Sequence, residues 1–191
     1  MTRTPAILLR RDCPAVRVPS GDGAVLPEGA AVYLVQSLGG SFTVQAPTVG
    51  GLFRIAAHDA DALGLDAPAP PVATKAAATG PASEEDVWRA LRQCYDPEIP
   101  VNIVDLGLVY DLTLSPASTR GGSPAQGGPA HVNVKMTLTA PGCGMGPAIA
   151  ADARGRILAL PGVASADVQL VWDPPWSADM ATPEGRRILG M

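Results

Sequence analysis

The chain has few aromatic residues, few cysteines and no long apolar run. Aromatic residues make up 4% of its 191 residues, so a core drawn from the 47% apolar residues must consist mainly of valine, leucine, isoleucine and alanine. No uninterrupted apolar stretch is long enough to span a bilayer. The short apolar piece near the N-terminus is followed at once by Arg10 and Arg11, which is not the pattern of a signal peptide. We therefore expect a cytoplasmic protein with no membrane partner.

The three cysteines, Cys13, Cys94 and Cys143, are odd in number and widely spaced, which argues against a disulfide framework. No CxxC motif is present, so one chain cannot supply a four-thiolate zinc or iron–sulfur site at the usual spacing. The net charge is −4 and no basic cluster occurs. Because phosphate contacts need lysine and arginine gathered on one face, we expect no nucleic-acid partner.

Glycine (21 residues) and proline (20 residues) divide the chain into recognisable regions. Residues 1–66 predict a small all-β module, of sandwich or barrel type, in which two β-prone runs flank Gly39 and Gly40 as in a hairpin. Residues 67–82 are rich in proline and alanine without apolar periodicity, which is typical of a linker. Residues 83–191 form the second predicted domain.

The second domain predicts the element order α-β-β-α-β. A helix begins at Ser83, whose side chain is a good N-cap. Alternating apolar residues over 108–114 and 131–138 predict a hairpin, and a helix starts where Pro147 is tolerated in its first turn. A third strand over 166–172 then lies parallel to the second. The fold class is therefore α/β, more closely a two-layer α+β arrangement. Its small mixed three-stranded sheet carries helices on one face and is preceded by the all-β module.

Cys143 occupies a turn between a predicted strand and a predicted helix. Free backbone N–H groups and the positive end of the helix dipole favour the thiolate there. Gly142 and Gly144 leave room for a ligand to reach both the sulfur and the backbone, and Thr137 and Thr139 offer hydroxyl groups just upstream. The turn is a candidate for a nucleophilic, metal-binding sulfur. The alternative is an ordinary small buried cysteine in a strand–helix turn.

Three carboxylates, Asp96, Glu98 and Asp105, lie in or beside a proline-braced loop that leads into the first strand of the hairpin. Cys143 follows the second strand, and antiparallel pairing brings the start of one strand beside the end of the other. We therefore expect the two loops to meet at one edge of the sheet. Carboxylates disfavour a neighbouring thiolate unless a cation lies between them, so a metal would resolve the conflict. The alternative is that Asp96 ends the helix and Glu98 is solvated.

The remaining candidates favour structural roles. Cys94 falls on the apolar side of the first helix of the second domain, so core packing is expected for it. Cys13 lies in a turn-like stretch, and its role is open, with a structural one favoured. Trp172 ends a strand in the inward register and is expected in the core. His131 belongs to the far end of the hairpin and His58 to the other domain, so neither is expected to act as a ligand. A thiol enzyme would therefore lack its usual general base.

Two stretches, DPEIPVNIVDLGLVYDL and MTLTAPGCGMG, resemble the small iron–sulfur assembly domain of the MIP18-type family. The N-terminal RDCPAVRVPSGDGAVLPEGAAVYLVQSLGGSFTV and the later VWDPPW resemble its SufT branch. The resemblance spans almost the whole chain apart from the linker and a low-complexity insertion at 115–130. It implies an α/β domain and a role in maturing iron–sulfur proteins. The residues matching the family's functional positions are the reactive Cys143, the acidic Asp96 and Glu98, and the nearby Thr137 and Thr139.

The expected function is that of a non-enzymatic accessory factor that matures or transfers iron–sulfur clusters to apo-proteins through Cys143. The expected cargo is a transient iron–sulfur cluster or iron, and the expected partners are apo iron–sulfur clients and other components of the SUF system. One thiolate per chain holds a cluster weakly, which suits transfer and favours a homodimer or a partner-supplied ligand. The alternative is a protein-interaction adaptor for metalloprotein maturation that carries no cluster of its own.

Overall fold

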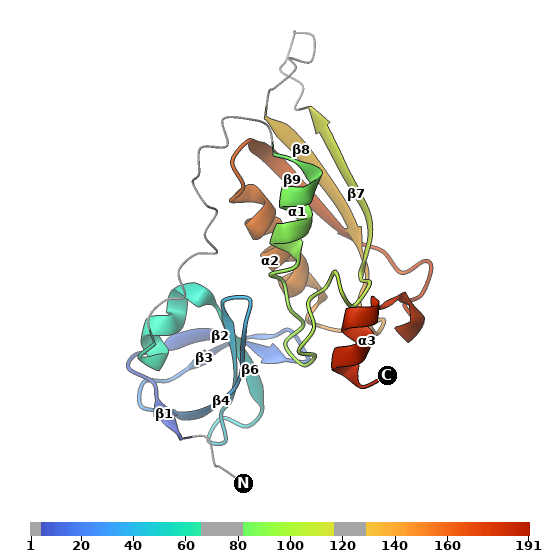
Figure 1. Cartoon of the computed structure of the whole chain (residues 1–191). Coiled ribbons are helices and arrows are strands. Elements are labelled where there is room, and N and C mark those ends of the chain that lie inside the picture. Colours follow the sequence, from blue (N-terminus) through green and yellow to red (C-terminus); the bar gives the residue numbers. More distant parts are fainter. Residues whose placement is uncertain (1–4, 66–81, 117–128) are drawn as a thin grey trace. The chain divides into compact units, whose positions relative to one another are not determined.

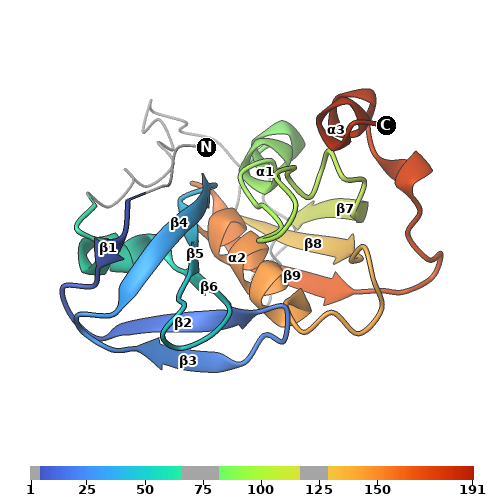
Figure 2. The same cartoon turned by 90° about the horizontal axis from the view of Figure 1, so that it is seen from below.

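The computed structural model describes residues 5–65, 82–116 and 129–191 (Figures 1 and 2). Most of the predicted linker and most of the predicted hairpin insertion therefore lie outside the described residues. The chain divides into two compact units. In the described residues the first unit comprises 5–65 together with the short segments 97–100 and 143–145, and the second comprises the remainder.

The first unit is an antiparallel six-stranded sheet in the order β1-β4-β5-β6-β2-β3. The predicted hairpin is confirmed, because β4 and β5 pair across Gly39 and Gly40, whose φ angles are 58° and 76°. Two successive residues with positive φ explain why glycine occupies both positions. The strands and a short 3-10 helix are β1 Ile7–Leu8, β2 Cys13–Val18, β3 Gly23–Leu26, β4 Ala31–Leu38, β5 Ser41–Gln45, β6 Leu52–Ile55 and η1 Ala57–Leu63.

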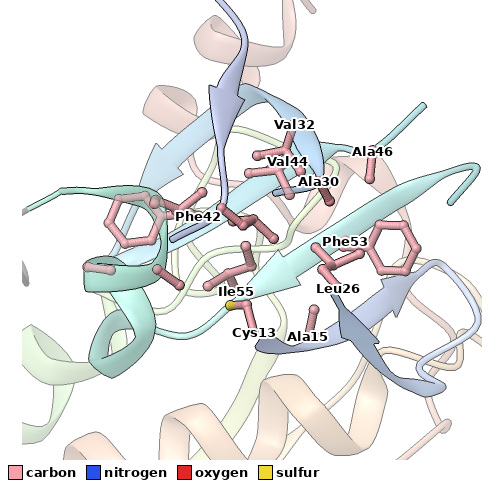
Figure 3. Packing of buried hydrophobic residues seen from close by; sticks show 14 residues of the cluster. Cys13, Ala15, Leu26, Ala30, Val32, Phe42, Val44, Ala46, Phe53 and Ile55 are labelled. Carbon is pink, nitrogen blue, oxygen red and sulfur yellow. The ribbon is translucent and has the colours of Figure 1, made fainter. Parts of the chain in front are cut away.

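The core of this sheet is a cluster of buried aliphatic side chains with two phenylalanines, Phe42 and Phe53. Figure 3 shows these side chains gathered in the space that the strands surround, with the sulfur of Cys13 among them. Cys13 is fully buried and begins strand β2 rather than lying in a turn, which supports the structural alternative for it. Because aromatic residues are scarce, small and branched side chains fill most of this core by close packing.

The second unit confirms the predicted α-β-β-α-β order. Its three-stranded sheet has the order β7-β8-β9, with β7 antiparallel and β9 parallel to the central β8. Helices α1 and α2 lie on the same face of this sheet (Figures 1 and 2). Its elements are α1 Glu84–Leu91, β7 Val109–Pro116, β8 Ala130–Met136, α2 Gly146–Leu158, β9 Val163–Leu170, the 3-10 helix η2 Ala178–Met180 and α3 Pro183–Leu189.

Local sequence signals explain where these elements begin. The Ser83 hydroxyl accepts a hydrogen bond from the Asp86 backbone, and the Asp86 carboxylate accepts one from the Ser83 backbone, which completes a capping box. Pro147 stands in the first turn of α2, where its missing N–H is not needed. The inward positions expected for β8 and the residues after it are confirmed as buried: Val132, Val134, Met136 and Leu138.

The opposite face of the three-stranded sheet is polar. Cross-strand pairing places Thr113, Asn133 and Asp167 in one row, since Thr113 pairs with Asn133 and Asn133 with Asp167. The neighbouring row joins Asp111, Lys135 and Gln169 through the same kind of pairing. Five of these six side chains are exposed, and Asn133 is half-buried. The sheet therefore buries one face against α1 and α2 and leaves the other polar.

The prediction for one core residue was wrong. Trp172 was predicted to end the third strand facing inward, but β9 already ends at Leu170 and Trp172 is 43% exposed. After Leu170 only the Val171 N–H continues the pairing, by donating to the Met136 carbonyl. The alternating pattern cannot be extended past that point, because the ladder that imposes it has stopped. Within the described residues, none of the helices combines the length and apolar character needed to cross a membrane.

Candidate functional site

Cys143 lies in the loop that joins β8 to α2, three residues before the first residue of the helix. It is half-buried, whereas Cys13 and Cys94 are buried. The structural role expected for Cys94 is confirmed by its complete burial. Cys143 is therefore the one cysteine of the chain whose side chain is partly open to an incoming reagent.

The buried thiol of Cys13 is chemically protected in a second way. Burial, together with the nearby Asp59 carboxylate, raises the pKa of Cys13 from 9.0 to about 11. A raised pKa means that folding favours the neutral thiol. This contribution to stability is complete below pH 9 and is lost as the pH rises toward 11.

We expect iodoacetamide at pH 8 to label one cysteine per folded chain, at Cys143. The reagent needs both access and thiolate, and burial denies access to Cys13 and Cys94. Peptide mass spectrometry after timed labelling measures the modified fraction at each cysteine, and labelling in urea provides the fully reactive reference. Modification of Cys13 at a rate close to that of Cys143 in the folded chain would contradict this expectation.

The loop between α1 and β7 is organised by Asn102. Its side-chain oxygen accepts hydrogen bonds from the backbone N–H groups of Val104 (3.1 Å) and Asp105 (2.9 Å). Its amide nitrogen donates to the Asp105 carboxylate at 2.6 Å. The Ile103 N–H also donates to the Cys94 carbonyl, which ties the loop to the end of α1. The loop is thus a hydrogen-bonded structure rather than a free connection.

Asp105, which the sequence placed among the candidate carboxylates, has a structural use here. Its carboxylate accepts from Asn102 and from the Thr182 hydroxyl, the latter at 3.2 Å. Its backbone carbonyl accepts from the Thr182 N–H at 2.9 Å. A carboxylate engaged by two side chains is already satisfied within the fold.

The loop that carries the acidic residues and the loop that carries Cys143 start from the same edge of the sheet. Val109 at the start of β7 pairs with Met136 at the end of β8. One residue outward, the Thr137 N–H donates to the Leu108 carbonyl at 2.8 Å. The predicted hairpin topology is therefore confirmed where the acidic loop enters β7 and the Cys143 loop leaves β8.

The two acidic candidates of the loop differ in environment. Asp96 is 7% exposed, whereas Glu98 is exposed. Glu98 belongs to the same compact unit as Cys143, while Asp96 belongs to the other unit. Among the described residues, no three histidine, cysteine, aspartate or glutamate side chains gather into a group that could hold a metal ion. A pocket shared by Asp96, Glu98 and Cys143 stays a prediction.

The two glycines beside Cys143 have different surroundings. Gly142 has a φ of 81°, and a β-carbon there would meet nothing within 4 Å. Within the first unit, a β-carbon on Gly144 would lie 1.8 Å from the Ser20 carbonyl oxygen. Gly142 therefore serves backbone conformation, and Gly144 permits a close approach of two chain segments.

The two threonines upstream of Cys143 are also distinct. Thr139 is half-buried, whereas Thr137 is 1% exposed. Among the buried side chains of the described residues, the Thr137 hydroxyl is the one without a hydrogen-bond partner. A buried hydroxyl without a partner is unfavourable, so this group is a candidate to bind something that the folded chain does not itself supply.

The two histidines have partners of their own. His131 pairs with Ser115 at the far end of the hairpin, as predicted, and its ring contacts the Ser165 hydroxyl. His58 belongs to the first unit, where its Nε2 lies 3.1 Å from the Asp59 carboxylate. That neither histidine acts as a ligand stays a prediction.

The sequence reasoning overlooked the residues that organise the loop before β7, above all Asn102 and Thr182. Two local signals mark them. Asn102 stands three residues before Asp105, a spacing at which an asparagine side chain can bond to the following backbone. Thr182 precedes Pro183 at the start of α3, which is the pattern of an N-cap.

The second unit is a small two-layer α/β domain, and the connection between its central strand β8 and helix α2 carries the half-buried Cys143. Residues 84–169 match the model of a family described as iron-sulfur cluster assembly protein. A protein of Porphyromonas gingivalis named Fe-S protein maturation auxiliary factor is 39% identical over 108 residues, which cover 56% of this chain and 91% of that protein. The chain belongs to this iron–sulfur cluster assembly family.

Two further bacterial relatives carry similar names. The Fe-S protein maturation auxiliary factor YitW of Bacillus subtilis is 36% identical over 110 residues, covering 58% of this chain and 96% of YitW. The Fe-S protein maturation auxiliary factor SufT of Staphylococcus aureus is 33% identical over 96 residues, covering 50% of this chain and 96% of SufT. The family resemblance read from the acidic loop and the thiol turn is confirmed.

Proposed function

We propose that this protein is an accessory factor in the maturation of iron–sulfur proteins, and that it handles an iron–sulfur cluster or iron as cargo through Cys143. The relatives named as maturation auxiliary factors support the general role. The observation that carries the residue assignment is the difference among the three cysteines, since Cys143 is half-buried and the other two are buried. The role is non-catalytic, because the cargo is passed on rather than chemically converted.

The surroundings of Cys143 fit a labile thiolate ligand. The sulfur is half-buried in the connection that leads into the 13-residue helix α2, so an incoming cargo can reach it. Iron–sulfur clusters are held by cysteine thiolates, and a single thiolate from one chain gives a weak hold. A weak hold suits a donor that passes its cargo to an apo-protein. Further ligands would come from a second copy of the chain or from the client.

The Thr137 hydroxyl gives a second point of contact for the cargo. It lies six residues before Cys143 in the same connection between β8 and α2, and it has no partner in the described part of the protein. A hydroxyl can donate to the sulfide or thiolate sulfur of a bound cluster. Such a hydrogen bond would satisfy a group that is otherwise buried without one.

Anaerobic reconstitution with iron and sulfide tests the proposal. We expect the wild-type chain to bind both iron and acid-labile sulfide, and we expect Thr137→Val to bind less. Valine replaces the unpartnered hydroxyl by a methyl group of similar size. We therefore expect the free energy of unfolding, measured in urea, to stay the same or to rise by about 1 kcal/mol at most.

Visible absorbance and chemical analysis of iron and sulfide per chain give the readout. Uptake of neither iron nor acid-labile sulfide by the wild type would overturn the cargo-handling role. Equal uptake by wild type and Thr137→Val would show that Thr137 does not contact the cargo. The role of Cys143 is tested separately, by Cys143→Ala.

A further inference from the structure

The segment that follows β9 turns back onto the loop before β7. The Trp176 indole N–H donates to the Leu106 carbonyl at 2.7 Å, across 70 positions of sequence. The Tyr110 hydroxyl donates to the Pro174 carbonyl at 2.9 Å. Trp176 is half-buried and Leu106 is fully buried. The indole therefore supplies a donor to the backbone of a residue enclosed by the fold.

Thr182, the N-cap of α3, makes a second attachment to the loop before β7, at Asp105. Thr182 bonds to Asp105 through both its backbone N–H (2.9 Å) and its hydroxyl (3.2 Å). The same hydroxyl accepts from the Gly185 N–H at 3.1 Å, so one side chain caps α3 and fixes the loop. The attachment joins secondary structure to the loop rather than one flexible side chain to another.

Two glycines show how closely the segments approach. A β-carbon on Gly107 would lie 2.1 Å from the Met180 carbonyl oxygen, and a β-carbon on Gly185 would lie 2.2 Å from the Asp105 carbonyl oxygen. Distances under 3 Å are far inside van der Waals contact, so backbone meets backbone on both sides. We call residues 174–185 the C-terminal clamp.

The clamp contacts residues 105–108, which connect the acidic loop to β7 and bond to the first residue of the Cys143 loop. Leu106 and Leu108 lie between the acidic loop and β7, and the Leu108 carbonyl accepts the Thr137 N–H. Thr137 opens the connection that carries Cys143. Fixing residues 105–108 therefore fixes one end of each candidate loop.

We propose that the C-terminal clamp positions the candidate site, and that Trp176 and Thr182 are positioning residues. The family model matches residues 84–169, so the clamp lies outside the matched segment. The proposal rests on the proposed function only where it concerns cargo. The positioning of residues 105–108 and of Thr137 can be measured without any cargo.

The first test compares Trp176→Phe with the full-length wild type. Phenylalanine keeps an aromatic ring but removes the donor to the Leu106 carbonyl. Trp88→Phe is the matched control, because the Trp88 indole also donates a hydrogen bond, to Glu84 at 3.1 Å within α1. We expect the amides of Leu106, Leu108 and Thr137 to exchange with deuterium about tenfold faster in Trp176→Phe and at the wild-type rate in Trp88→Phe.

The second test uses the hydroxyl of Thr182. Thr182→Ser keeps the hydroxyl, whereas Thr182→Val keeps the branched shape and loses it. We expect Thr182→Ser to match the wild type in amide exchange and in the rate of iron–sulfur uptake. We expect Thr182→Val to lose several-fold in uptake rate. Recovery by the serine variant separates hydrogen bonding from side-chain volume, which a merely space-filling role would not do.

The two tests separate failure of the clamp from failure of the proposed function. Wild-type exchange at Leu106, Leu108 and Thr137 in Trp176→Phe would overturn the clamp. So would equal amide exchange of the serine and valine variants at residue 182. Faster exchange in a protein whose wild type takes up neither iron nor sulfide would support positioning by the clamp and overturn the cargo assignment.

Discussion

Replacing Cys143 by alanine is expected to abolish iron–sulfur uptake while leaving the fold intact. The side chain is half-buried and lies in a loop, so its removal leaves no large cavity. Losing a side chain that only hydrogen-bonds to a ligand already lowers metal affinity by about 10–100-fold, and losing the ligand itself costs more. Anaerobic reconstitution followed by iron and sulfide analysis measures the loss, and urea unfolding monitored by circular dichroism measures the stability.

Cys13→Ala is the matched control for this variant. It removes a thiol that the first unit buries completely, so it should lower stability by about 1–2 kcal/mol and leave iron–sulfur uptake unchanged. We therefore expect Cys13→Ala to lower stability without changing uptake, and Cys143→Ala to abolish uptake without unfolding the chain. Wild-type uptake by Cys143→Ala would reject the assignment of this thiol as the cargo ligand.

Gly107→Ala is expected to be the most destabilising glycine substitution in the second unit, at about 3 kcal/mol or more. The residue has a φ of 69°, which an alanine adopts only with strain. Its β-carbon would also lie 2.1 Å from the Met180 carbonyl oxygen, so η2 would have to move away from the loop. Urea unfolding measures the change, and amide exchange at Leu106 shows whether the clamp has been displaced.

Gly142→Ala provides the matched comparison. Its φ of 81° carries the same kind of backbone strain, but a β-carbon there meets nothing within 4 Å. We expect a loss of about 1 kcal/mol from strain alone. The difference between the two variants then measures the close approach of η2 to Gly107. Equal losses in both would show that the contact with Met180 contributes nothing.

The parts of the fold that the sequence predicts are those governed by neighbouring residues. Ser83 marks the start of α1 because capping involves residues three positions apart. Pro147 marks the first turn of α2, and the Gly39-Gly40 pair marks the β4–β5 turn, because each limits its own backbone angles. The inward alternation along β8 follows from the geometry of a single strand.

The parts that the sequence does not predict depend on contacts between distant positions. Asp105 looks like a loop carboxylate in sequence, but its partner Thr182 lies 77 residues away. The positive φ of Gly107 belongs to a local turn, but the close approach of the Met180 carbonyl to Gly107 and of the Asp105 carbonyl to Gly185 involves segments far apart in sequence. The exposure of Trp172 depends on where pairing with β8 stops, which local alternation does not mark.

The same limit applies to the candidate site. Topology predicts that the two loops begin side by side, and the bond between Thr137 and Leu108 agrees with it. Topology does not predict that the Thr137 hydroxyl is buried without a partner, because that depends on how neighbouring side chains pack around it. The candidate cysteine could therefore be chosen from sequence, whereas the unpartnered hydroxyl had to be found in the structure.

The polar face of the three-stranded sheet gives the experimenter a place to attach probes. Thr113 and Asp167 stand on its exposed rows, on the side of the sheet away from α1 and α2. Solvent-facing positions of this kind usually change stability by less than about 0.5 kcal/mol when substituted. With Cys143 replaced, a cysteine introduced at either position could carry a fluorophore or spin label without disturbing the fold. Such labels would report on encounters between this domain and the apo-proteins proposed as its partners.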